Sequence, residues 1–145
     1  MPSQIELDRT YMGVANLHAQ LSKAERKKVG ACLVTRTGII IPGYNGNPAG
    51  MSNVCEDENN VTLPSVIHAE LNCILKAAKE GVSCENATIY ITLSPCEQCA
   101  AMLVQAGVKT VVYSETYRSQ NGLALLYKAG LVYRRVNELG ETYYD

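Results

Sequence analysis

The chain contains no tryptophan and no phenylalanine, so its nine tyrosines are the only residues of that aromatic class. Any stacking against a ligand therefore comes from a tyrosine or from an aliphatic side chain. The chain also has no excess of charge of either sign, because 13 basic and 14 acidic residues give a net charge of −1. That balance supplies no long-range attraction to nucleic acid or to an anionic membrane, and we expect neither as a partner.

Long apolar runs are absent as well, and none approaches the roughly 18 residues of a membrane-spanning helix. Glu6, Asp8 and Arg9 fall among the first ten residues, which is not the pattern of a signal peptide. We therefore expect a cytoplasmic protein. A length of 145 residues, with 47% apolar and 19% charged residues, further predicts one globular domain over residues 1–145.

Six cysteines are present, an even number that a secreted protein could pair as disulfides. A cytoplasmic protein with a core of this size needs no such cross-links, so we expect free thiols. Cys32 and Cys73 lie in apolar stretches and are expected to pack as small hydrophobic side chains. Cys96 and Cys99 differ, because their spacing places both on one face of a helical turn.

Hydrophobic periodicity predicts helices over residues 4–20, 65–80, 96–105 and 120–129, and strands over residues 31–35, 39–44, 87–93, 110–114 and 131–136. A short turn joins the first two strands as a hairpin, whereas helices join the last three, which favours parallel pairing there. We therefore expect an α/β fold with a mixed five-stranded sheet between helical layers.

A loop of 20 residues, 45–64, separates the hairpin from the second predicted helix. Loops of this length commonly cover a site or bind a ligand. The loop contains Glu56, Asp57 and Glu58, which we expect to be a solvated acidic run. The alternative is that these acids help to place Mg²⁺ beside a triphosphate.

Two short motifs lie at the starts of predicted helices: His-Ala-Glu at 68–70 and Pro-Cys-Glu-Gln-Cys at 95–99. Cys96 and Cys99 have the spacing of two ligands of one tetrahedral metal, and the positive end of a helix favours their thiolates. His68 supplies a third ligand and leaves one coordination position open, as in catalytic zinc sites. A lone CxxC could be a redox pair and a lone histidine an ordinary polar group, but together they favour zinc.

Glu70 follows His68 by two residues and is expected to reach a water molecule at the metal. The ordinary alternative is an acid favoured by the helix dipole. Two thiolates cancel the formal charge of Zn²⁺, so this ion acidifies water less than one held by three histidines, and a carboxylate beside the water becomes useful. The combination H-x-E…P-C-x-x-C is the signature of zinc nucleobase deaminases, in which the Glu is the general acid and base.

On these motifs the chain resembles the deoxycytidylate (dCMP) deaminases, in particular the compact type of phages and bacteria. The resemblance spans residues 22–133 and is carried by Arg-Lys-Lys-Val-Gly-Ala at 26–31, Gly-Tyr-Asn-Gly-Asn-Pro at 43–48, His-Ala-Glu-Leu-Asn at 68–72, Pro-Cys-Glu-Gln-Cys-Ala at 95–100 and Gln-Ala-Gly-Val-Lys at 105–109. It implies a three-layer αβα cytidine deaminase-like fold and the zinc-dependent hydrolysis of dCMP to dUMP and ammonia, a step that feeds thymidylate synthesis. Because only His18 and scattered cysteines remain outside the motifs, we expect one zinc per chain.

The resemblance also implies which residues bind the substrate: Asn45 for the sugar, Ala69 and Ser94 for the edge of the base through their backbone, and Arg26 and Ser22 for the 5′-phosphate. A planar guanidinium suits a phosphate, although Arg26 could instead belong to a solvated basic turn. Tyr117 and Arg118, which follow the fourth predicted strand, are weaker candidates for the phosphate.

Members of this family are commonly activated by dCTP, inhibited by dTTP with Mg²⁺, and assembled as homohexamers, so the resemblance implies the same here. The regulatory nucleotide would bind at Gly43, Tyr44, Asn45 and Gly46. Glycines there permit close approach of a ligand, and the tyrosine offers a ring and a hydroxyl. The alternative is a pair of turn glycines around an ordinary tyrosine at a strand end.

Two other functions stay open. The chain could be a zinc deaminase for free cytidine, guanine or tRNA adenosine, although its near-neutral charge argues against a tRNA substrate. It could also be a zinc-stabilised binding module on the same fold, which would have no use for the carboxylate of Glu70. We expect an enzyme, a zinc-dependent dCMP deaminase.

Overall fold

The structure, a computed structural model, describes residues 1–143. In chain order its elements are α1 (Gln4–Ala19), β1 (Gly30–Val34), β2 (Ile40–Tyr44), α2 (Ala69–Glu80), β3 (Thr88–Leu93), α3 (Glu97–Ala106), β4 (Thr110–Glu115), α4 (Asn121–Lys128) and β5 (Val132–Arg135). The predicted helices and strands are found in the predicted order. Within residues 1–143, no helix combines the length and the apolar character needed to cross a membrane.

The five strands form one mixed sheet in the order β2-β1-β3-β4-β5. β1 runs antiparallel to both β2 and β3, while β3, β4 and β5 run parallel to one another. The parallel pairs arise because α3 connects β3 to β4 and α4 connects β4 to β5, and each helix returns the chain to the starting edge of the sheet. The mixed five-stranded sheet is therefore confirmed.

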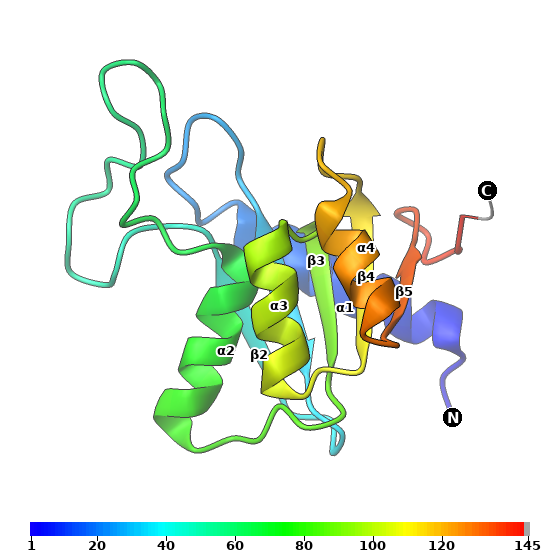
Figure 1. Ribbon diagram of the computed structural model, residues 1–145. Coiled ribbons are helices and arrows are strands. Elements are labelled where there is room, and N and C mark those ends of the chain that lie inside the picture. The colour runs from blue at the N-terminus through cyan, green and yellow to red at the C-terminus, as the bar shows by residue number, and fades with distance from the viewer. Residues whose placement is uncertain (144–145) are drawn as a thin grey trace.

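Helices cover both faces of this sheet, with α1 on one face and α2, α3 and α4 on the other (Figure 1). Neighbouring side chains along a strand point to opposite faces of the sheet, so the core is divided into two clusters, one on each face. Ile89 and Ile91 of β3 pack in the cluster beneath α2, α3 and α4, whereas Tyr90 packs with Met12 and Ala15 of α1. The three-layer αβα fold is thus confirmed.

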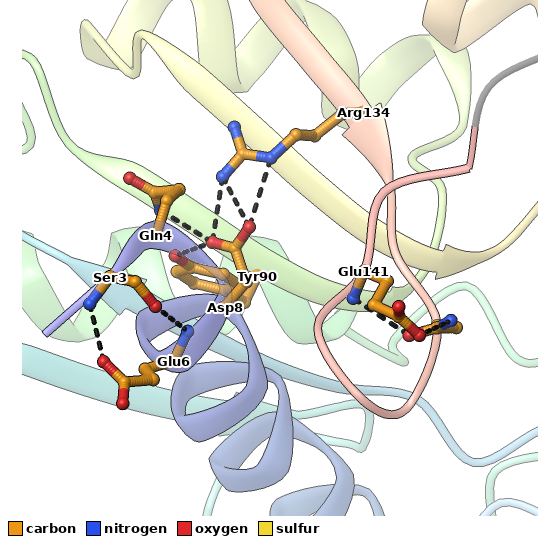
Figure 2. A network of polar contacts seen from close by, with 8 residues as sticks. Ser3, Gln4, Glu6, Asp8, Tyr90, Arg134 and Glu141 are labelled. Atoms are coloured by element: carbon orange, nitrogen blue, oxygen red, sulfur yellow. Dashed lines mark hydrogen bonds and ion pairs between the residues drawn. The ribbon is translucent and has the colours of Figure 1, made fainter.

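The single helix α1 is fixed to its face by a buried carboxylate, that of Asp8, which is 2% exposed. Its oxygens accept hydrogen bonds from Tyr90 Oη at 2.7 Å, from Gln4 Nε2 at 2.8 Å and from Arg134 Nη2 at 2.8 Å, as Figure 2 shows. Burying a carboxylate costs free energy unless it is paired and hydrogen-bonded, and here it is both. The network therefore joins α1 to β3 and β5.

The start of α2 differs from the prediction. We expected a helix from residue 65, but α2 begins four residues later, at Ala69, with His68 as its N-cap. Ile67 instead forms an antiparallel bridge with Gly46, just beyond β2, through backbone hydrogen bonds of 2.8 and 3.1 Å. This pairing directs the chain into α2 from the end of the hairpin.

The two glycines of the Gly-Tyr-Asn-Gly stretch have different surroundings. At Gly43, a Cβ atom would lie 2.9 Å from the carbonyl oxygen of Ala69 and 3.0 Å from the Sγ atom of Cys73, so β2 lies against α2 only because this residue has no side chain. At Gly46, a Cβ atom would meet nothing within 4 Å. Gly43 therefore has a packing role that Gly46 lacks.

We predict that Gly43→Ala lowers the free energy of unfolding by about 1–3 kcal/mol, because overpacking forces α2 away from β2. Gly46→Ala, the matched control, should change it by less than about 0.5 kcal/mol. Urea denaturation of both zinc-loaded variants, followed by circular dichroism, measures the difference. Equal midpoints for the two variants would contradict this interpretation of the packing.

Candidate metal centre and active site

The site lies at one edge of the sheet, where two helices begin. β3 ends at Leu93 beside Glu115, the last residue of β4, and the chain then enters α3 with Cys96 as its N-cap. α2 begins at the same edge, with His68 as its N-cap. The connection from α1 to β1 and the loop from β2 to α2 also reach this edge (Figure 1). Ligands of α/β proteins bind at such strand ends, where helix N-termini and loops converge.

His68, Cys96 and Cys99 come together there, with their potential ligand atoms all within 4.8 Å of one another. The Nδ1 atom of His68 is 3.2 Å from the Sγ atom of Cys99 and 3.7 Å from that of Cys96. A tetrahedral zinc, with Zn–S of about 2.3 Å and Zn–N of about 2.0 Å, would separate such atoms by about 3.5 Å. The donor set therefore fits zinc. Residues 1–143 contain no second group of three or more His, Cys, Asp or Glu side chains placed in this way.

The two thiols of this cluster have opposite electrostatic environments. Hydrogen bonds with Cys99 and with His68 lower the pKa of the Cys96 thiol to about 4. The neighbouring Cys96 sulfur and burial together raise the pKa of Cys99. Cys96 is thus prepared as a thiolate ligand, and binding of a metal ion would displace the proton of Cys99 as well.

Glu70 lies in the first turn of α2 and is 4% exposed. Burial raises the pKa of its carboxyl group to about 7, against a smaller opposing effect of His68. A carboxyl group with a pKa near neutrality can both accept and donate a proton. Its side chain lines the same cavity as His68 and Cys96, so an acid–base group and metal ligands share one space.

That cavity has a volume of about 340 Å³. Three cationic side chains line it, those of Arg26, Lys27 and Arg118, together with the carboxyl groups of Glu56 and Glu70. Arg26 was the favoured phosphate ligand in the sequence analysis, and Arg118 was a weaker candidate. A cavity with an acid–base carboxyl inside and several cations on its walls suits a small molecule that carries an anionic group.

Among the residues expected to contact substrate, Ala69, Ser94 and Asn45 also line the cavity, but Ser22 does not. The hydroxyl of Ser22, 1% exposed, donates to the backbone oxygen of Asn45 at 2.9 Å and accepts from the backbone N–H of Ala24. Its hydrogen bonds are therefore made within the protein.

The side chain of Asn45 is also engaged with backbone. Its Oδ1 atom accepts from Val29 N at 2.9 Å, and its Nδ2 atom donates to the carbonyl oxygen of Lys27 at the same distance. Asn45 thus holds the segment that precedes β1 as well as facing the cavity.

Glu56 is the functional candidate that the sequence did not reveal. We expected a solvated acidic run, and Asp57 and Glu58 are indeed exposed, but Glu56 is only 9% exposed and lines the cavity. No local signal separates it from its two neighbours, because its hydrogen-bond partners lie 30 and 31 residues away in the chain.

A second cavity, of about 300 Å³, lies beside the first. Tyr44, Asn45 and Gly46 line it together with Lys23, whereas Gly43 packs against α2 instead. Asn45 and Cys55 line both cavities, so the two share part of a wall.

Comparison with known proteins gives one family for this chain. Residues 5–115 match the family model described as the cytidine and deoxycytidylate deaminase zinc-binding region. The chain is similar to the ComE operon protein 2 of Bacillus subtilis, with 37% identity over 98% of this chain and 77% of that protein. It is also similar to the deoxycytidylate deaminase of Mus musculus, with 36% identity over 90% of this chain and 80% of that protein.

A solved structure extends this likeness to three dimensions. The dCMP deaminase from the cyanophage S-TIM5, in complex with dCMP and dUMP, superimposes with a TM-score of 0.86 and 40% sequence identity. The match covers 90% of this chain and 97% of that chain.

We predict that Cys99→Ala abolishes stoichiometric zinc binding and lowers the thermal midpoint, because metal affinity contributes to folding stability. Cys84→Ala is the matched control, since Cys84 is also a buried free cysteine but precedes β3, at the opposite edge of the sheet. Zinc content by elemental analysis separates the two. A Cys99→Ala protein that retains one zinc per chain would remove this residue from the ligand set.

Proposed function

The chain belongs to the cytidine and deoxycytidylate deaminase family, and on that basis we propose that it hydrolyses dCMP to dUMP and ammonia. The observation that carries the proposal is one cavity lined by Glu70, by His68 and Cys96 of the His/Cys/Cys cluster, and by cationic residues. The similar cyanophage enzyme, whose structure holds dCMP and dUMP, supports the same substrate and product. dUMP would then serve thymidylate synthesis.

His68, Cys96 and Cys99 would hold a zinc ion, which supplies Lewis-acid chemistry that makes a water molecule more acidic. Glu70 accepts a proton from the attacking water as oxygen adds to C4 of the cytosine. The same carboxyl group returns a proton to N3 and then assists the departing ammonia. A pKa of about 7 suits Glu70 to both directions of transfer near neutral pH.

The backbone at Ala69 and Ser94 would hold the edge of the base. Ser94 is fixed in place from two sides, because its N–H donates to Glu115 O at 2.8 Å and its hydroxyl accepts from Tyr117 N at 2.7 Å. Its carbonyl oxygen is then the backbone group suited to accept from the exocyclic amino group of cytosine. Asn45, on the same cavity, would contact the sugar.

Arg26 is the principal group proposed for the 5′-phosphate. Its guanidinium makes a long contact of 3.4 Å with Thr62 Oγ1, which leaves its planar edge suited to bidentate binding. Lys27 is paired with Glu115 at 2.5 Å, so its charge is partly neutralised. Arg118 lines the cavity from the segment after β4 and would be a second donor.

We also propose that the second cavity is a regulatory site at which dCTP activates and dTTP with Mg²⁺ inhibits, in a cytoplasmic homohexamer. The family resemblance supports this, as does the presence of Tyr44 and Gly46 in the lining of that cavity. Asn45 lines both cavities and would transmit a conformational change from the regulatory cavity to the active site.

We predict that Glu70→Gln keeps one zinc per chain but lowers kcat for dCMP by about 10²–10⁴, because the amide cannot transfer the proton. Glu97→Gln is the matched control, as Glu97 is the first-turn acid of α3 and is exposed. Single-turnover kinetics with zinc analysis measures both. Undiminished turnover by Glu70→Gln would exclude the proposed mechanism.

Deamination of dCMP beside deoxycytidine, monitored in the ultraviolet, tests the substrate directly. We expect turnover of dCMP in clear preference to deoxycytidine, raised by dCTP and lowered by dTTP with Mg²⁺. Turnover without any response to the triphosphates would keep the reaction and exclude the regulatory site. Zinc-loaded protein that turns over neither pyrimidine would contradict the proposed function.

A further inference from the structure

Glu56 occupies an unusual place for an acidic loop residue. It lies between β2 and α2, is 9% exposed, and lines the cavity that holds Glu70. A tight hairpin fixes it there: Glu56 pairs with Thr62 in an antiparallel bridge, and Asp57 closes the turn with backbone and side-chain hydrogen bonds to Val61. The position of the carboxylate is therefore set by local structure.

Within residues 1–143, the hydrogen bonds to this carboxylate come from backbone N–H groups. Its oxygens accept from the N–H of Glu25 at 3.1 and 3.3 Å and from the N–H of Arg26 at 3.2 Å. The ion pairs found within residues 1–143 join other side chains, Lys27 to Glu115 and Arg134 to Asp8. A carboxylate that is costly to bury is thus used to hold two consecutive amides of an irregular segment.

That segment carries Arg26, and the same hairpin holds this residue at both ends. Glu56 binds its backbone N–H, and Thr62, the bridge partner of Glu56, contacts its guanidinium at 3.4 Å. On the far side of the segment, Asn45 binds Lys27 and Val29. Arg26 lines the cavity, and contacts within the protein hold both its backbone and its guanidinium before any ligand arrives, which lowers the entropic cost of binding.

We propose that Glu56 is a positioning residue: by fixing the backbone of residues 25–26, it places the Arg26 guanidinium at the cavity and so gives the enzyme its preference for a nucleotide over a nucleoside. This inference rests on the proposed function. A carboxylate suits the task because its Oε2 atom accepts from both N–H groups and its Oε1 atom also faces the N–H of Glu25, so both oxygen positions require an acceptor. A glutamine would turn an NH₂ group toward one of those donors.

A carboxylate near a bound phosphate could instead act by repulsion. The two roles make opposite predictions, since removing a repelling charge would tighten the binding of dCMP, whereas releasing the Arg26 segment would weaken it. The sign of the change in KM therefore separates them.

The test compares Glu56→Gln with Glu58→Gln, an exposed acid in the same loop, as the matched control. We expect Glu56→Gln to raise KM for dCMP roughly tenfold, with kcat within about twofold and with zinc content unchanged. Kinetic constants for deoxycytidine, which has no phosphate, should stay the same. The inhibition constants of dUMP and deoxyuridine give the same comparison for binding alone.

Arg26→Ala provides the second arm. If Glu56 acts through Arg26, Glu56→Gln should add little to the KM already raised by Arg26→Ala, so that the two effects are not additive. Should Glu56→Gln fail to fold, Thr62→Val removes only the contact with the guanidinium, and it should raise KM for dCMP about twofold without changing deoxycytidine turnover.

An unchanged or lowered KM for dCMP would overturn the proposal. So would an equal loss on dCMP and deoxycytidine accompanied by lost zinc, because that pattern belongs to a general structural defect. Full additivity with Arg26→Ala would show that Glu56 acts elsewhere. Wild-type protein that does not turn over dCMP at all would instead overturn the proposed function itself, and this inference with it.

Discussion

Two helix N-termini meet at one edge of the sheet, and the arrangement of the cavity depends on that meeting. α3 follows β3 directly, and α2 arrives through the bridge between Gly46 and Ile67, so Cys96 and His68 become the N-caps of neighbouring helices. An N-cap side chain lies at the positive end of its helix, which favours a thiolate there. Glu70, in the first turn of α2, is then buried beside the cluster, and burial is what brings its pKa to about 7.

One wall of the cavity is irregular backbone, and backbone of that kind has to find hydrogen-bond partners among side chains. Asn45 and Glu56 supply them for the segment before β1, and the hydroxyl of Ser22 is engaged close by. Polar residues in a sequence motif can thus serve two purposes. They can bind a ligand, or they can form hydrogen bonds with the backbone that makes up the cavity wall. Asn45 lines the cavity and also hydrogen-bonds to the backbone of its wall, whereas Ser22 hydrogen-bonds to backbone without lining the cavity.

Local sequence signals were enough to predict most of the fold and the metal cluster. Strands with strong apolar runs and helices closed by glycine lie close to where they were expected, and the CxxC and HxE spacings identify residues that the structure brings together. The start of α2 was wrong because tertiary pairing of Ile67 overrides the local helix signal of Ser65. Glu56 was missed because its partners lie about 30 residues upstream, and a single sequence does not show such a pairing.

The contact between Asp8 and Arg134 joins residues 126 positions apart in the chain. During synthesis α1 is made before β5, so its buried carboxylate gains this guanidinium partner only when β5 has been made, roughly 6–25 s later at typical elongation rates. The network that fixes α1 to the sheet is therefore completed only after β5 has been made. Until then the Asp8 carboxylate of the ribosome-bound chain lacks its guanidinium partner, and truncated products that stop before β5 would be unable to complete this network.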